Sequence, residues 1–458
     1  MSGAFSKLPL SAEMLANLDT LGYREMTPIQ AQSLPAILER RDLIARAKTG
    51  SGKTAAFGIG LLQQLNIRQF RVQALVLCPT RELADQVGKD LRRLARATHN
   101  IKVLTLCGGM PLGPQLGSLE HGAHVVVGTP GRIQEHLRKG SLQLEHLRML
   151  VLDEADRMLD MGFQEAIADI VAHTPATRQT LLFSATYPKS IAALSANLLR
   201  DPVHISVDEQ HNPQQIEQIF FEIARDARQQ ALIRLLEHYH PASCVVFCNT
   251  RQQCQELSQS LRQDGFDALA LHGDLEQKER DQVLVRFANK SCTILLATDV
   301  AARGLDIKEL AMVVNYELSR DAEVHVHRVG RTGRAGAAGL ALSLYTPEEA
   351  HRLNAIEKYI GLEATLGELP APARNAQNFA APMTTLCIDG GRKDKLRAGD
   401  ILGALTAANG IAGKDVGKID IFDFHAYVAV ARDNATRALH CLNNGNIKGR
   451  QFKARYVD

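Results

Sequence analysis

Short apolar runs separated by helix-length segments recur along most of this 458-residue chain. The runs of the first half are Ala74–Cys78, Val103–Cys107, His124–Val127, Met149–Leu152 and Thr180–Phe183. Those of the second half are Val245–Phe247, Ala268–Leu271, Thr293–Ala297, Met312–Val314 and Leu340–Leu342. Continuous apolar strands joined by crossover helices are typical of parallel sheets that are covered on both faces. The sequence therefore predicts two tandem α/β domains, at residues 1–207 and 216–365.

The rest of the chain predicts a linker and a third, smaller domain. Residues 366–382 are rich in Pro and Ala and have no regular periodicity, as expected of a linker. Residues 383–458 predict strand, helix, two strands, helix and strand, in that order. The expected elements are Thr385–Ile388, Asp400–Leu405, Ile419–Ile421, Tyr427–Val430, Asn434–Leu442 and Phe452–Val457. This βαββαβ order resembles that of an RNA-recognition motif (RRM).

Composition and charge narrow the class of protein. Hydrophobic residues make up 45% and charged residues 22%, which excludes wholesale disorder and collagen-like structure. The formal net charge is only +3, from 53 Lys and Arg against 50 Asp and Glu. Residues 383–458, however, contain 12 Lys and Arg against 8 Asp and Glu. The excess positive charge therefore belongs to the third domain, where a polyanionic partner would bind.

The N-terminus has no secretory signal, and no apolar stretch is long enough to span a bilayer, so we expect a cytoplasmic protein. The eight cysteines show no C-x-x-C pair and no zinc-type spacing. Most of them lie in apolar runs such as Cys244–Cys248, which predicts reduced, buried thiols.

A glycine loop with the order of a phosphate-binding loop lies between a strand-like run and a helical run. Its residues are Ala47, Lys48, Thr49, Gly50, Ser51, Gly52, Lys53 and Thr54. Backbone N–H groups at a helix N-terminus can surround phosphates, Lys53 adds positive charge, and the Thr54 hydroxyl can ligate Mg²⁺. Ala47 replaces the first glycine of the general pattern, and a plain glycine-rich turn is the alternative.

Two acids follow the buried run at Met149–Leu152. Asp153 and Glu154 would lie at the carboxyl end of a strand, where open α/β sheets bind ligands. A solvated helix start is the alternative interpretation. With the glycine loop upstream, Asp153 becomes the second Mg²⁺ ligand and Glu154 the residue that orients the attacking water.

Asp153-Glu154-Ala155-Asp156, the Gly50–Thr54 loop and Ser184-Ala185-Thr186 together resemble the DEAD-box family of ATP-dependent RNA helicases, over residues 5 to about 345. The resemblance implies two RecA-like domains, ATP and Mg²⁺ as cofactors, and coupling between the domains through Ser184, Thr186 and His327. Tyr23 and Gln30 fall in the family's Q motif, where the glutamine amide reads adenine.

The resemblance also assigns RNA contacts and catalytic arginines. The positions that match RNA-contacting residues of the core are Arg81, Gly109, Thr129, Arg132, Gln277, Arg280 and Thr298. Asp306 matches a nucleotide-binding position. Arg331 and Arg334 match arginine fingers that complete the ATP site when the domains close, and they would lie near each other if their segment is helical. Solvated salt-bridge partners are the alternative for these arginines.

The third domain leaves two questions open. Tyr427 is equally consistent with a core residue and with a platform for stacking bases. Two basic clusters, at 392–397 and at Lys448, Arg450, Lys453 and Arg455, are either a solvated face or a phosphate-binding surface. With the helicase core, this tail closely resembles the bacterial DbpA subfamily, which implies a 23S ribosomal RNA hairpin as target and a role in large-subunit assembly.

Other classes of function use the same motifs. An RNA clamp or scaffold would need the ATP site without separating strands, and a DNA helicase would need a similar core. A plain binding module has no use for a complete split ATP site. We expect a monomer that acts on RNA, with no membrane and no evident protein partner.

Overall fold

The computed structural model describes residues 3–47, 50–187, 189–207, 216–302, 310–333, 339–372, 379–407 and 410–457. The described residues up to 207 form one compact unit, and those from 216 onward form a second.

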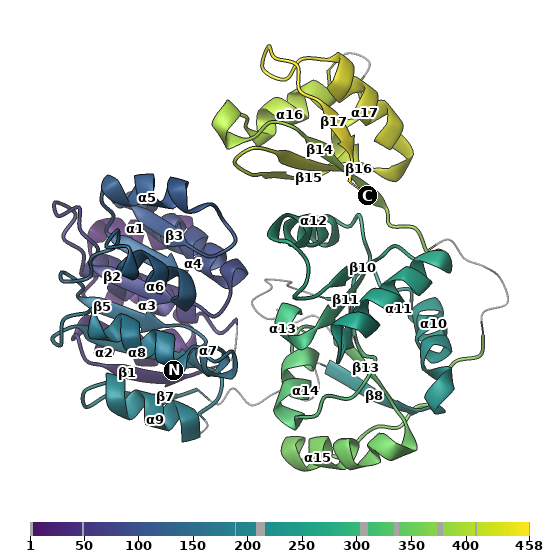
Figure 1. Cartoon of the computed structure of the whole chain (residues 1–458), viewed down its shortest axis with the longest axis horizontal. Helices are drawn as coiled ribbons and strands as arrows, with labels where there is room; N and C mark the ends of the chain where they lie inside the picture. Colours follow the sequence, from purple (N-terminus) through teal and green to yellow (C-terminus); the bar gives the residue numbers. More distant parts are fainter. Residues whose placement is uncertain are drawn as a thin grey trace. The chain divides into compact units, whose positions relative to one another are not determined.

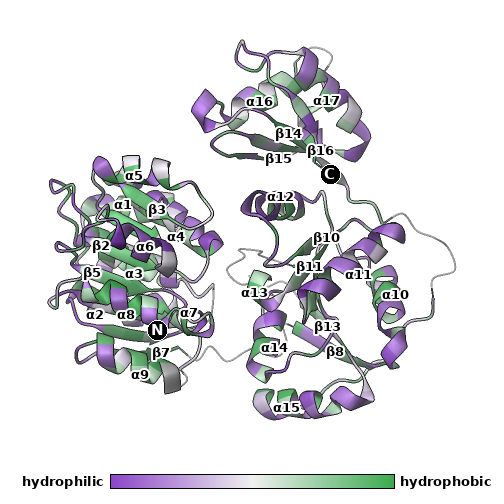
Figure 2. Ribbon diagram, viewed as in Figure 1, coloured by the Kyte–Doolittle hydropathy of each residue, from purple (hydrophilic) through white to green (hydrophobic). Residues whose placement is uncertain are grey.

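The first unit is built on a seven-stranded parallel sheet in the order β3-β4-β2-β5-β6-β1-β7 (Figure 1). The strands are β1 (Leu43–Arg46), β2 (Ala74–Leu77), β3 (Val103–Leu106), β4 (Val125–Gly128), β5 (Met149–Leu152), β6 (Gln179–Ser184) and β7 (Val203–Ser206). Figure 2 shows hydrophobic colour along these strands, as expected of a sheet that helices cover on both faces.

Helices α1 to α4 pack on one face of this sheet and α6 to α9 on the other. They are α1 (Ala12–Thr20), α2 (Pro28–Leu38), α3 (Lys53–Gln63), α4 (Arg81–Leu94), α6 (Pro130–Arg138), α7 (Ala155–Asp160), α8 (Gln164–Ala172) and α9 (Lys189–Leu198), with α5 at Leu112–Glu120. The strands β5, β6 and β1 are neighbours and run parallel. Their carboxyl ends therefore bring three loops together: the glycine loop after β1, the acids after β5 and Ser184-Ala185-Thr186 at β6.

The second unit contains a six-stranded parallel sheet in the order β10-β11-β9-β12-β13-β8. Its strands are β8 (Ile216–Glu222), β9 (Cys244–Cys248), β10 (Ala268–Leu271), β11 (Ile294–Thr298), β12 (Met312–Asn315) and β13 (Gly339–Tyr345). Its helices are α10 (Arg228–Tyr239), α11 (Arg251–Gln263), α12 (Gln277–Ala288), α13 (Asp299–Ala302), α14 (Ala322–Val329) and α15 (Ala350–Ile360). Two parallel-sheet domains are thus confirmed.

The C-terminal domain has the predicted βαββαβ order. Its antiparallel sheet runs β15-β16-β14-β17. The elements are β14 (Met383–Ile388), α16 (Ala398–Leu405), β15 (Val416–Ile421), β16 (Ala426–Ala431), α17 (Ala435–Asn444) and β17 (Ala454–Tyr456). Leu386, Ile388, Val428 and Val430 pack with the two helices in one hydrophobic core. Because side chains alternate along a strand, the residues between them point to the opposite face of the sheet.

That opposite face contacts α12 of the second parallel-sheet domain. Cys387 and Tyr427 pack against Val285, and Tyr427 is only 1% exposed. The Thr385 hydroxyl accepts a hydrogen bond from the Asn289 amide at 2.9 Å. Tyr427 is therefore a buried contact residue, which settles the question that the sequence left open. The sheet face on which an RRM stacks bases is covered here.

The cysteines of the chain are free, and all except Cys441 are buried, as expected. Burial raises the pKa of the Cys107 thiol to about 12, so this cysteine stays protonated. Within the described part of the chain, no helix combines the length and apolar character that crossing a membrane requires.

Candidate active site and RNA-binding surfaces

The glycine loop joins β1 to the N-terminus of α3. Gly50 and Gly52 have positive φ angles of 87° and 96°, and Gly52 is the N-cap of α3. Lys53 is buried, and its Nζ donates a hydrogen bond to the Ala47 carbonyl at 2.8 Å. Ser51 and Thr54 follow the turn at half-buried positions. Lys48 and Thr49 lie outside the described residues. A glycine turn that leads into a helix N-terminus, with a buried lysine at the first helical position, is the arrangement that phosphate binding uses.

Gln30 connects the N-terminal segment to this loop. Its side-chain carbonyl accepts a hydrogen bond from the Thr27 N–H at 2.9 Å, and its amide donates to the Gly52 carbonyl at 3.1 Å. A Cβ at Gly52 would lie 2.5 Å from the Gln30 amide nitrogen, so only glycine fits this position. Tyr23 packs edge-on against Phe5, with ring centroids 6.3 Å apart. The predicted adenine-reading glutamine is therefore in direct contact with the loop that would hold the phosphates.

Asp153 follows β5 and lies beside the glycine loop. It is 3% exposed, and its Oδ1 has no hydrogen-bond partner among the described residues. Burial raises the pKa of this carboxyl to about 7, although Lys53 partly offsets the effect. Glu154 is buried too and caps α7 in the left-handed conformation, with φ 53°. A buried carboxylate oxygen without a partner fits a hard cation such as Mg²⁺.

Asp156 links this acid segment to Ser184-Ala185-Thr186, a role that the sequence did not indicate. Its Oδ2 accepts hydrogen bonds from the N–H groups of Ala185 and Thr186 at 3.1 and 3.0 Å. The Thr186 hydroxyl donates a third, at 3.0 Å. Ser184 is buried at the end of β6, and its hydroxyl has no partner in the described chain. A movement of the acid segment would therefore be transmitted directly to Thr186.

Three predicted RNA-contacting segments of the first domain meet at one loop. Gly109 has a φ of 74°, and a Cβ there would overlap the Arg81 guanidinium. The guanidinium of Arg132 donates two hydrogen bonds to the Met110 carbonyl, both at 3.1 Å. Thr129, which precedes α6, is buried. The structure thus brings Arg81, Gly109, Thr129 and Arg132 together in one region.

Two residues that the sequence did not indicate, Gln115 and His136, hold Arg132 in place. Gln115 Oε1 accepts from Arg132 Nη1 at 2.9 Å and lies 3.0 Å from His136 Nε2. Burial and the charge of Arg132 lower the pKa of His136, which favours the neutral imidazole. The position of Arg132 is therefore fixed by buried neighbours.

In the second domain, α12 and the end of β11 carry the predicted RNA contacts. Gln277 Nε2 donates to Asp281 at 2.9 Å. Arg280 donates to the carbonyls of His272 and Ala301, at 3.4 and 3.5 Å. Thr298 is the last residue of β11. Gln277 and Arg280 lie at the N-terminus of α12, while Asn289, which follows its opposite end, contacts the C-terminal domain.

Arg328 is a second structural residue that the sequence did not indicate. It is 2% exposed and forms a bidentate pair with Asp299, at 2.6 and 2.8 Å. It also donates to the Asn249 side chain at 2.9 Å and to the Glu317 carbonyl at 2.8 Å. Arg328 thereby joins the ends of β9, β11 and β12, and breaking such a buried pair costs about 3–5 kcal/mol.

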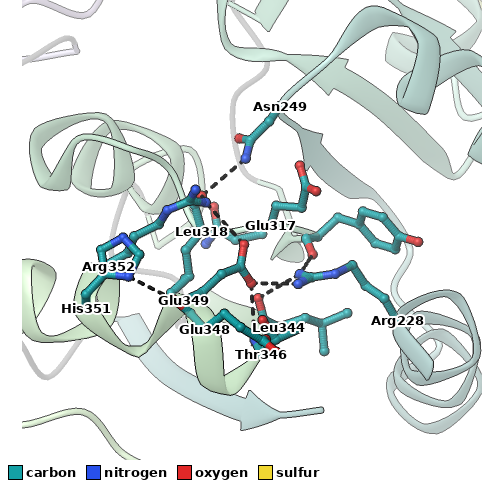
Figure 3. A network of polar contacts seen from close by, with 12 residues as sticks. Arg228, Asn249, Glu317, Leu318, Leu344, Thr346, Glu348, Glu349, His351 and Arg352 are labelled. Carbon is teal, nitrogen blue, oxygen red and sulfur yellow. Dashed lines mark hydrogen bonds and ion pairs between the residues drawn. The ribbon is translucent and has the colours of Figure 1, made fainter. Parts of the chain in front are cut away.

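Asn249, which accepts a hydrogen bond from Arg328, also belongs to a larger polar network that Figure 3 shows. Arg228 and Arg352 donate to the two carboxylate oxygens of Glu349, at 2.6 and 3.1 Å. Arg352 and Asn249 both donate to the Leu318 carbonyl, at 3.1 and 3.3 Å. The network ties α10 and α15 to the segment that leads into α14.

The two arginines predicted to be catalytic, Arg331 and Arg334, come after α14 in the sequence. The helix ends at Val329, so the helical spacing expected for Arg331 and Arg334 does not apply at Arg331. Arg331 and His327 are half-buried, and the Arg331 N–H donates to the Arg328 carbonyl at 3.2 Å. Arg334 and Asp306 lie outside the described residues. Arg331 thus lies three residues after Arg328, in the segment that Arg328 holds in place.

One end of the C-terminal sheet gathers basic side chains. The loop after β14, the β15–β16 turn and the loop before β17 all lie there, because β14 pairs antiparallel with β16 and β17. Arg455 is paired with Asp389, and Lys448 lies 3.9 Å from Asp400. The exposed basic residues at this end that form no ion pair with any described residue are Lys393, Lys395, Arg397, Arg450 and Lys453. We call this surface the basic end.

Comparisons with known proteins agree with these features. Family models match residues 27–194 (DEAD/DEAH box helicase), 227–336 (helicase conserved C-terminal domain) and 385–456 (DbpA RNA binding domain). The chain is 55% identical to the ATP-dependent RNA helicase DbpA of Escherichia coli strain K12, over 99% of both chains. It is 38% identical to DbpA of Bacillus subtilis strain 168, over 98% of both.

A solved structure of similar fold is S. cerevisiae Dbp5 bound to RNA and ADP BeF3. Its TM-score is 0.74 at 30% identity, over 80% of this chain and 96% of that one. The part of this chain that Dbp5 leaves uncovered is about as long as the C-terminal domain. By its motifs, its two parallel-sheet domains and its full-length relatives, the chain belongs to the DEAD-box family, as an ATP-dependent RNA helicase of the DbpA type.

Proposed function

We propose that the chain uses its C-terminal domain to recognise a 23S ribosomal RNA hairpin and remodels RNA there during large-subunit assembly in the cytoplasm, as a monomer. The observation that carries this proposal is the basic end. The usual base-stacking face of the C-terminal sheet is covered by α12, whereas the basic end exposes cations that no described carboxylate neutralises. Such cations bind phosphates and release counterions.

The ATP site supports a cycle that depends on domain closure. Lys53 and the N-terminus of α3 hold the phosphates, and Thr54 and Asp153 hold Mg²⁺, which would offset phosphate charge when bound. Glu154 orients the attacking water, and Gln30 recognises adenine. Closure brings Arg331, and Arg334 with it, to the γ-phosphate. Asp156 and Thr186 carry the change at the acid segment to the domain boundary.

RNA would bind across both domains. Arg81, Gly109, Thr129 and Arg132 contact its backbone from the first domain, and Gln277, Arg280 and Thr298 contact it from the second. Since RNA and ATP both favour the closed arrangement, each increases affinity for the other. Loss of phosphate reopens the core and releases the RNA, while the basic end keeps its hold on the hairpin.

Changing Arg450 and Lys453 to alanine tests the proposed surface. We expect weaker binding of the 23S rRNA fragment that activates the ATPase best, because two phosphate contacts are lost. The slope of log affinity against log salt should fall by about 1 for each contact. ATPase activity at saturating RNA should stay unchanged. The measurement is a salt titration of binding by the full chain.

Lys414→Ala with Lys418→Ala is the matched control. It removes the same charge from the opposite edge of the sheet, at and just before β15. Equal losses of affinity in both double variants would show that only net charge matters and would contradict the proposed surface.

A further inference from the structure

The turn between β15 and β16 presents an aromatic ring that the helicase function described so far does not use. Phe424 is 65% exposed. The other aromatic side chains of this segment pack on one another. The ring of Phe422 lies 5.4 Å from that of Tyr427, and the ring of His425 lies 6.0 Å from that of Tyr427, between centroids. Phe424 is not part of the cluster that Phe422 and Tyr427 form with Val285 of α12.

The backbone of this turn is held firmly. The Phe422 N–H donates to the His425 carbonyl at 2.8 Å, which closes the turn around Asp423 and Phe424. From the loop after β14, the N–H groups of Arg392 and Lys393 donate to the carbonyls of Phe422 and Asp423, at 2.8 and 2.9 Å. The ring is thus presented from a fixed backbone, so little conformational entropy is lost when it binds a partner.

Gly391 allows this contact. A Cβ at this position would lie 2.4 Å from the Phe422 carbonyl oxygen and 2.6 Å from the Asp423 carbonyl carbon, so any larger residue would push the turn away. Gly391 leads directly into the basic segment at 392–397. The turn and the basic segment are therefore packed together as one surface.

Two basic residues, Arg392 and Lys393, lie on the loop whose backbone is hydrogen-bonded to this turn. Arg392 pairs with Asp423, the residue before Phe424, at 3.0 Å. The neighbouring Lys393 is exposed and forms no ion pair with any described residue. An exposed ring beside basic residues matches the two properties of a nucleotide, a flat base and a negatively charged phosphate. An apolar protein partner would not need the cations, and between its two ends a helical duplex offers no free base face.

From this arrangement we propose that Phe424 is a stacking platform for an unpaired base of the RNA that the basic end holds. Arg392 and Lys393 contact the phosphates beside that base. This inference rests on the proposed RNA-binding role of the basic end, and it adds recognition of an unpaired nucleotide at a fixed position.

Binding of two RNA probes to the full chain tests the proposal. One is a 23S rRNA hairpin fragment with an unpaired loop, and the other is a blunt duplex of the same length without unpaired bases. Phe424→Ala should weaken binding of the hairpin about 5- to 150-fold, the range that corresponds to one stacked base. Binding of the duplex should not change. Phe424→Tyr keeps a flat ring and should restore the affinity for the hairpin.

A fluorescent adenine analogue placed at successive loop positions gives a second readout. One position should be quenched by the unchanged chain and by Phe424→Tyr, but not by Phe424→Ala. Equal weakening of hairpin and duplex would overturn the stacking role. Unchanged hairpin binding by Phe424→Ala, together with loss of binding by Arg450→Ala and Lys453→Ala, would overturn stacking and leave the basic end intact. If neither variant changed binding, the proposed surface would fail as well.

Discussion

Replacing Arg331 by alanine should lower the RNA-stimulated turnover of ATP by about 10³- to 10⁵-fold, the effect of an arginine finger. The residue follows α14, on the segment that Arg328 and Asp299 anchor. Lys53, Asp153 and the glycine loop lie in the first unit and are unchanged, so affinity for ATP should stay nearly the same. The measurement is kcat at saturating RNA, together with equilibrium binding of a fluorescent ATP analogue.

Arg262→Ala is a suitable control, because Arg262 is an exposed residue on α11. Thermal unfolding should show that Arg331→Ala leaves the second domain folded, since the buried anchor is Arg328. Normal hydrolysis by Arg331→Ala would contradict its assignment as a catalytic arginine.

Replacing Lys53 by alanine should weaken ATP binding and lower RNA-stimulated hydrolysis by about 10²- to 10³-fold. The Lys53 ammonium is buried beside Asp153, and it is the charge on the phosphate loop that opposes the raised pKa of that carboxyl. Without it, phosphate binding loses a buried cation, and losing one such stabilising group costs about 10²- to 10³-fold in rate. Titration calorimetry with ATP, beside steady-state ATPase assays, distinguishes this result from that of Arg331→Ala.

Lys53→Arg serves as the comparison, because it keeps the charge and changes the shape of the donor. It should retain more affinity for ATP than Lys53→Ala. ATP binding by Lys53→Ala at the affinity of the unchanged chain would show that the loop does not hold phosphates.

The two parallel sheets could be predicted because most of their strands are buried and read as continuous apolar runs. The sequence did not predict that β7 and β8 are strands. Each lies at the edge of its sheet, and their sequences, Val-His-Ile-Ser and Ile-Glu-Gln-Ile-Phe-Phe-Glu, mix polar and apolar residues. An edge strand has one unpaired side, so it does not need the apolar character that identifies a central strand.

The candidate site was predictable where a local motif carries the chemistry, as at Gly50–Thr54 and Asp153. Asp156 and Arg328 lie within recognisable motifs, but their partners, Thr186 and Asp299, are about 30 residues away in the sequence. The role of Tyr427 could not be predicted from the sequence either. Its alternation within β16 is consistent with either a core or an RNA-binding face, and only the contact with Val285 decides between them.

The basic end was only partly predictable. The two basic clusters are visible in the sequence, but the antiparallel pairing of β14 with β17 is what brings them to the same end of the sheet. The pairing of Arg455 with Asp389 also depends on that fold, and it separates this arginine from the exposed cations nearby. Which basic residues of the C-terminal domain are free to bind phosphate therefore depends on the tertiary structure.

ATPase activation by RNA tests most directly whether the C-terminal domain directs the motor to 23S rRNA. The full chain is titrated with fragments that tile 23S rRNA, and with 16S rRNA and an unrelated RNA as comparisons. One hairpin-containing 23S fragment should half-activate the ATPase at a concentration at least about ten-fold lower than any other RNA, a difference of about 1.4 kcal/mol. Equal half-activating concentrations for all RNAs would contradict targeted recognition.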